Sequence, residues 1–192
     1  MRNVTLAALV AALPFHASQA AEKAHEHGVG VLNLAVEGRQ VEIELTVPGA
    51  DAVGFEHRPS SDADRHAVEA AIAKLKAAGT LFTFPAAAGC ALEEAEVHAA
   101  QLEDDHKDDH KDEHKHDHKD DHKDDHKDDH KDEHAEFRAH YHFECSYPGE
   151  LSHVDVGFFK AFPSAHELEA RFITPGGQGA AELTAGAARL KF

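Results

Sequence analysis

The sequence predicts an α+β fold: a mostly antiparallel β-sheet or sandwich with one packed helix at about residues 62–78 and a disordered, histidine-rich insertion. Three observations lead to this fold class. Apolar and polar residues alternate in most segments, as they do in half-buried strands. One segment alone has apolar residues at helical spacing. A further segment, residues 104–134, contains no apolar residue at all.

The first predicted elements form a β-hairpin. Leu32, Leu34 and Val36 alternate with small or polar residues, and the alternation resumes over residues 41–47 after a turn at Glu37-Gly38. This pattern predicts two antiparallel strands with one buried face.

The predicted helix follows the hairpin. Ser61 or Asp62 is the expected N-cap, and Val68, Ile72 and Leu75 lie on one face of the helix. Further strands are predicted at Thr80–Pro85, Ala91–Leu102, Glu136–Cys145, Ser152–Phe159, Leu168–Thr174 and Arg189–Phe192.

The amino terminus has the pattern of a secretory signal peptide. A positive start is followed by an apolar run from Val4 to Phe15, and Ser18-Gln19-Ala20 places small residues where signal peptidase reads. We expect cleavage after Ala20, which leaves a periplasmic protein with a single domain at residues 21–192. The run is too short to span a bilayer, and no later stretch is apolar enough. A buried N-terminal helix is the alternative.

Residues 104–134 form a degenerate repeat with 15 acids, seven lysines and nine histidines. A segment without apolar side chains cannot offset the entropy lost on ordering, so we expect this insertion to be disordered. A helix is the alternative, because histidines four residues apart would then lie on neighbouring turns. We expect that helix only when bound metal ties the turns together.

The positions of the two cysteines can be used to check whether the insertion is the loop of a β-hairpin. If segments 91–102 and 136–145 pair as a hairpin with the repeat as its loop, Cys90 and Cys145 lie opposite each other within a short register slip. Export also permits a disulfide. We therefore predict a Cys90–Cys145 bridge below the base of the insertion, with two free buried thiols as the alternative.

Composition excludes several classes of partner. The formal charge of −17 would repel both nucleic acid and an anionic membrane surface, and it suits a cationic partner. Histidine is unusually frequent, with 19 residues in 192. Neutral imidazole is the commonest protein ligand for zinc and similar divalent metals, and carboxylates can complete the coordination shell.

The repeat supplies the first group of candidate zinc ligands. A flexible chain can gather its histidines around roughly two to three ions, in weak sites that release metal below a pH of about 6 to 7. These nine candidates are His106, His110, His114, His116, His118, His122, His126, His130 and His134.

A second group of candidate ligands lies in the segments predicted to be ordered. Each His-x-His pair on a strand points both imidazoles to one face, and we expect such residues to converge on a tighter zinc site. Three other histidines, His66, His98 and His166, are expected to have no metal role. The ordered candidates are His25, His27, His57, His140, His142 and His153.

Several short blocks of sequence resemble the ZrgA-type periplasmic zinc-binding proteins of Gram-negative bacteria. They are His25-Glu26-His27-Gly28, Gly54-Phe55-Glu56-His57-Arg58-Pro59, Ala88-Gly89-Cys90 and Phe143-Glu144-Cys145, with the histidine-rich insertion between the last two. The resemblance implies a periplasmic protein of zinc acquisition that hands Zn²⁺ to a zinc ABC importer or its solute-binding protein. It also strengthens His25, His27 and His57 as candidates.

Two other classes fit less well. Solute-binding components of zinc importers also carry charged histidine-rich loops, but they have two α/β lobes and are much longer. No Gly-x-Ser-x-Gly, His-Glu-x-x-His or phosphate-loop motif is present, so we expect no enzymatic activity. The alternative to delivery is a scavenger or detoxification buffer for zinc, nickel or copper without an importer partner.

Overall fold

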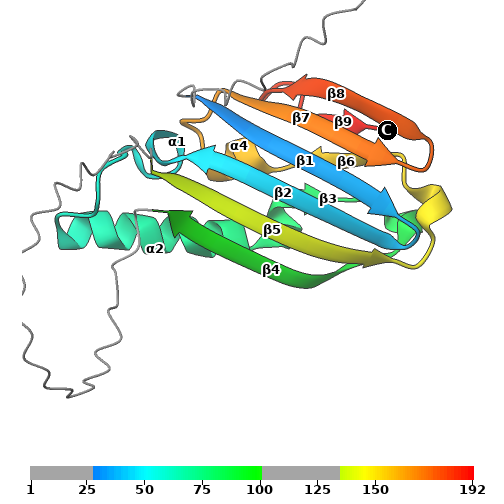
Figure 1. Cartoon of the computed structure of the whole chain (residues 1–192), viewed down its shortest axis with the longest axis horizontal. Helices are drawn as coiled ribbons and strands as arrows, with labels where there is room; N and C mark the ends of the chain where they lie inside the picture. Colours follow the sequence, from blue (N-terminus) through cyan, green and yellow to red (C-terminus); the bar gives the residue numbers. More distant parts are fainter. Residues whose placement is uncertain (1–27, 101–134) are drawn as a thin grey trace, which may run out of the picture.

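The computed structural model describes residues 28–100 and 135–192, and Figure 1 shows its large sheet from the front. The strands of this sheet lie in the order β4-β5-β2-β1-β7-β8, and a smaller sheet has the order β3-β6-β9. Neighbouring strands are antiparallel except β1 and β7, which are parallel. The strands are β1 Val29–Glu37, β2 Gln40–Pro48, β3 Phe82–Thr83, β4 Cys90–Ala100, β5 Glu136–Cys145, β6 His153–Val156, β7 Glu167–Thr174, β8 Gly177–Leu183 and β9 Arg189–Lys191.

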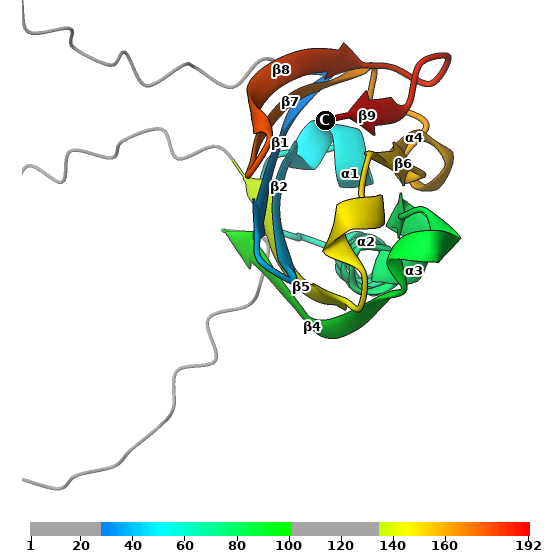
Figure 2. The same cartoon turned by 90° about the vertical axis from the view of Figure 1, so that its right-hand side faces the viewer.

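The helices and the smaller sheet pack on one face of the large sheet. Figure 2 shows this sheet edge-on and curved, with the helices and β3, β6 and β9 on its concave side. The opposite, outer face of the large sheet carries no element of the described chain. The predicted α+β class is therefore confirmed. The helices are α1 Gly49–Val53, α2 Asp62–Lys76, α3 Ala78–Leu81 and α4 Phe158–Ala161.

Helix α2 is the helix that the sequence predicts. Ser61 caps it in a capping box, in which its hydroxyl accepts from the N–H of Asp64 and the Asp64 carboxylate accepts from the N–H of Ser61. Hydrogen bonds from the backbone N–H of Ser60 and from Ser61 lower the pKa of Asp64 to about 2. Val68, Ala71 and Leu75 lie on one face of the helix, and this face is buried against the sheet.

Alternating side chains of the central strands build the core. Leu32 and Leu34 of β1 pack with every second residue of β2 and β5, and the latter include Phe137 and Tyr141. The polar residues between them face outward, so each strand has one buried and one exposed face. Phenylalanine supplies most of the buried aromatic rings in the described chain.

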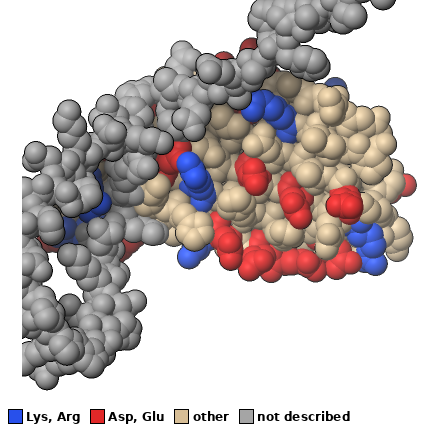
Figure 3. Space-filling model, viewed as in Figure 1, with Lys and Arg blue, Asp and Glu red and all other residues tan. Residues whose placement is uncertain are grey.

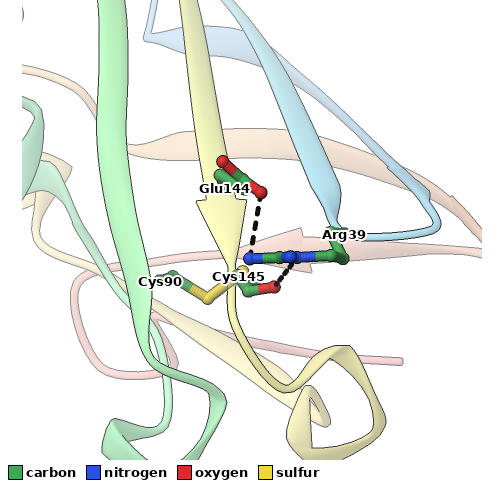
Figure 4. The surroundings of a disulfide bond; sticks show 4 residues. All are labelled: Arg39, Cys90, Glu144 and Cys145. Carbon is green, nitrogen blue, oxygen red and sulfur yellow. Dashed lines mark hydrogen bonds and ion pairs between the residues drawn. A yellow bond between two sulfur atoms is a disulfide. The ribbon is translucent and has the colours of Figure 1, made fainter.

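The predicted hairpin and its disulfide are both present. Strands β4 and β5 pair with Cys90 directly opposite Cys145, and the two sulfurs are bonded. A bulge between Leu92 and Glu94 shifts the register by one residue toward the insertion, which accounts for part of the slip in the predicted pairing. Arg39, before β2, donates to the carbonyl of Cys145 and pairs with Glu144 at 3.0 Å, as Figure 4 shows.

Two predicted strands are shorter in the structure. The strand expected at Thr80–Pro85 is reduced to Phe82–Thr83, because α3 occupies the preceding turn. The strand expected at Ser152–Phe159 ends at Val156, and α4 then begins.

Packing of the aromatic residues explains this second change. A strand would point Phe158 and Phe159 to opposite faces, whereas α4 buries both of them together with Phe162. Strand β8 was not predicted. Its Gly- and Ala-rich sequence, Gly177–Leu183, has low strand propensity and pairs through its backbone with β7.

Two predictions fall outside the residues that the structure describes. They are the signal peptide at residues 1–20 and the disordered state of the insertion at 104–134. Both stay predictions.

Replacing Tyr141 with phenylalanine is expected to lower the free energy of unfolding by about 1–2 kcal/mol. The buried Tyr141 hydroxyl donates to the carbonyl of Leu75 at 2.9 Å, and that carbonyl lies in the last turn of α2, where helices lack backbone partners. Burial raises the pKa of Tyr141 far above its usual value, so the hydroxyl remains a donor. Urea unfolding checks this, with Y147F at an exposed tyrosine as the control, for which we expect no change.

Candidate metal sites

One end of the large sheet brings together the attachment points of both histidine-rich segments. Gly28 directly follows His25-Glu26-His27, and Ala135 directly follows the repeat. Figure 1 shows the chain entering and leaving the described fold at this end, on the left of the view. We call this region, from Gly28 to α1 and Ala135, the sheet end.

Helix α1 joins these two attachment points. The N–H of Gly49 donates to the carbonyl of Ala135 at 2.8 Å, which fixes the base of the insertion against α1. Two residues later, both carboxylate oxygens of Asp51 accept from the N–H of Gly28, at 3.0 and 3.1 Å. Asp51 is only 6% exposed, so this charge-assisted bond is shielded from water.

Gly49 is crowded because the segment after α1 folds back over it. A Cβ at this position would lie 2.7 Å from the carbonyl oxygen of Phe55 and 2.9 Å from that of Ala135. No side chain fits between two backbone carbonyls at those distances, so the close approach requires glycine. The same contact places the Phe55-Glu56-His57 segment at the sheet end.

His57 has the geometry of an available metal ligand. Its ring stacks on Phe55, with 4.8 Å between the centroids, and the residue is exposed. Its Nδ1 lies 2.9 Å from the carbonyl oxygen of Arg58. A carbonyl can only accept, so Nδ1 carries the proton and Nε2 of the neutral ring is left with a lone pair. Metal-binding histidines commonly have this arrangement.

His166 also lies at the sheet end, although we expected no metal role for it from the sequence. Its backbone N–H donates to the carbonyl of Gly28 at 2.9 Å. Its ring is so close that a Cβ on Gly28 would lie 2.8 Å from Cδ2 of His166. The parallel pairing of β1 with β7 causes this contact, and no local sequence pattern announces that pairing.

The other ordered candidates lie elsewhere. His140 and His142 share the outer face of β5, as their alternation predicts. His153 belongs to the smaller sheet, where its Nε2 lies 4.0 Å from Asp155. A hydrogen bond from Arg189 lowers the pKa of Asp155.

The structure therefore distributes the ordered candidates that it describes among three places. His57 is at the sheet end, His140 and His142 are on the outer face, and His153 is in the smaller sheet. Within residues 28–100 and 135–192, no group of three or more His, Cys, Asp or Glu side chains has metal-binding geometry as it stands. His25, His27 and the nine histidines of the repeat lie outside the residues described.

The donor groups define a class of protein. Imidazole and carboxylate side chains in this abundance, 19 histidines and 36 acidic residues in one chain, are typical of proteins that bind divalent transition metals. Comparison with known families agrees with this class. The family model described as ZrgA family zinc uptake protein matches residues 24–192, and the chain belongs to this family.

Family membership gives the protein a role related to zinc uptake. Comparison with curated proteins found no match. A disulfide is typical of proteins that fold outside the cytoplasm, and a zinc-uptake family agrees with that location. None of the helices in the described residues is both long and apolar enough to cross a membrane.

Proposed function

We propose that this protein is a non-catalytic, periplasmic zinc-binding protein that captures Zn²⁺ and delivers it for uptake. The repeat collects the ion through many weak imidazole and carboxylate contacts. The sheet end then holds it more tightly, with His25, His27 and His57 as ligands and His166 beside them. A zinc ABC importer or its solute-binding protein receives the ion, after an N-terminal signal has directed the protein to the periplasm.

The observation that carries this proposal is the shared attachment of the two histidine-rich segments. Gly28 and Ala135 are both bonded to α1, through Asp51 and Gly49. A collector and a tighter site joined to one short helix can exchange an ion without diffusion through bulk solvent, because tethering raises the local concentration of each for the other. His57 presents an available Nε2 at the same end.

Calorimetric titration of the mature protein with Zn²⁺ tests the proposal. A variant with all nine repeat histidines changed to glutamine is expected to lose several weak equivalents and to keep at least one tight equivalent. In H57Q/H166Q the weak equivalents should remain, while the tight Kd rises by about 10-fold or more.

The matched control is H66Q/H98Q, which removes two exposed histidines of α2 and β4 that are not proposed as ligands and should leave the tight Kd unchanged. If the repeat variant binds no zinc, the proposal of a tight site outside the repeat is wrong. If H57Q/H166Q binds like the control, the sheet end is not the tight site.

Delivery and simple buffering differ in their effect on growth. A strain that lacks the protein should grow poorly under zinc starvation if the protein delivers zinc, and under zinc excess if it only buffers. Membership of a zinc uptake family favours the first outcome.

A further inference from the structure

The outer face of the large sheet carries a second arrangement of imidazoles and carboxylates, away from the sheet end. On β5, His140 and His142 point outward between two neighbouring strands. His140 lies opposite Glu96 of β4 and Glu44 of β2. In the next outward-facing row, His142 lies opposite Glu94 and Glu42. We call these two rows the Glu–His–Glu rungs.

Backbone register, rather than a flexible loop, sets the spacing of the rungs. Side chains directly opposite on neighbouring antiparallel strands have Cβ atoms about 4.5–5.5 Å apart, and successive outward residues of one strand are about 7 Å apart. Two imidazoles and four carboxylates therefore occupy one small patch. Figure 3 shows acidic side chains gathered over the β2, β5 and β4 half of this face.

The nearest imidazole–carboxylate pairs are almost at zinc-binding separation. Nδ1 of His140 lies 3.8 Å from Oε1 of Glu44, and Nε2 of His142 lies 3.7 Å from Oε1 of Glu42. Tetrahedral zinc with ordinary bond lengths holds its nitrogen and oxygen ligands about 3.4 Å apart. All four side chains are between 42% and 60% exposed, so small rotations can close the difference.

Nearby cations do not neutralise these carboxylates. Arg39 pairs with Glu144, and Arg138 pairs with Glu136. Among the described residues, no ion pair engages Glu94 or Glu96. The rungs thus hold four negative charges around two imidazoles, an arrangement that favours a dication over a monovalent ion.

We propose that the Glu–His–Glu rungs form a second zinc site, in which His140 and His142 share one ion, Glu42 and Glu44 complete its coordination, and Glu94 and Glu96 add negative charge. The inference rests on the proposed function in that zinc is taken as the ion the protein carries. Because its ligands are exposed and must rotate, the site exchanges zinc readily. It gives the ion a second binding site on the sheet, apart from the sheet end.

Side-chain nitrogen NMR of the whole protein, with the repeat intact, tests the inference. Variants H140Q and H142Q identify the two imidazole signals, which Zn²⁺ is expected to shift together over one concentration range. E42Q/E44Q keeps both imidazoles and should raise the apparent Kd at these signals about 10-fold, or about 1.4 kcal/mol.

The control E37Q/E182Q makes the same charge change at two exposed glutamates of the same sheet that face no histidine, and it should leave the Kd unchanged. The substituted positions are exposed except for His142, which is half-buried, and equal urea midpoints would verify that the variants fold.

Signals of His140 and His142 that stay still while the protein takes up zinc would overturn the second site and leave the proposed function standing. Signals that move over different concentration ranges would overturn the shared ion. If E42Q/E44Q and E37Q/E182Q raise the apparent Kd equally, charge alone attracts the ion, and coordination by Glu42 and Glu44 is overturned. A protein that binds no zinc at all would overturn both proposals.

Discussion

Removing the Cys90–Cys145 disulfide is expected to lower the free energy of unfolding by about 4 kcal/mol. The bridge joins residues 55 positions apart and closes a loop that contains the whole repeat. A long closed loop restricts the unfolded chain strongly, which is the main way a disulfide stabilises a fold. Strand β4 is also an edge strand that pairs with β5 alone, so the bridge holds it in place.

Urea unfolding of C90S/C145S, compared with the intact protein, measures this effect. The intact protein treated with a thiol reductant is the matched control, since it breaks the same bond without changing the sequence. Both should show the same loss. A loss below about 1 kcal/mol in both would mean that the unfolded chain is already restricted without the bridge.

Replacing Asp51 with alanine is expected to lower the free energy of unfolding by about 2 kcal/mol and to raise the Kd of the tight zinc site about 10-fold. The buried Asp51 carboxylate accepts from the N–H of Gly28, the residue next to His27. Without that anchor, the His25-Glu26-His27 segment loses its fixed attachment to α1. Asp51 would thus position zinc ligands without touching the ion.

Zinc competition and urea unfolding check the two parts of this prediction. D51N keeps an acceptor of similar size and should retain part of the affinity. The control D155A removes an exposed aspartate paired with Arg189 and should cost less than about 1 kcal/mol, with no change in zinc affinity. If D51A unfolds more easily but binds zinc normally, Asp51 is structural only.

The sequence predicted the framework wherever one local pattern determines one structure. Period-two alternation through Val41, Ile43 and Leu45 identified β2 and its buried face, and Ser61 identified the start of α2. The pairing of β4 with β5 was predicted as a hairpin that places the two cysteines opposite each other. The same alternation placed His140 and His142 on the outer face.

What the sequence could not supply depends on long-range contacts. Nothing local to Gly177–Leu183 indicates a strand, because its Gly and Ala residues join the sheet through backbone bonds to β7. The sheet end depends on backbone contacts among Gly28, Gly49 and Ala135, which are remote in sequence. The position of His166 beside Gly28 is also a long-range effect, since only the β1–β7 pairing brings the two residues together. The local sequence therefore predicts no metal role for His166.

The parallel pairing of β1 with β7 has a consequence for how the chain folds. β1 lies inside the large sheet, and one of its two edges pairs only with a strand near the opposite end of the sequence. Folding dominated by such distant contacts is slow, because the intervening chain must close before any pairing energy is gained. A nascent chain that stops before Glu167 leaves β1 half-paired, so the sheet matures only once nearly all of these residues have been made.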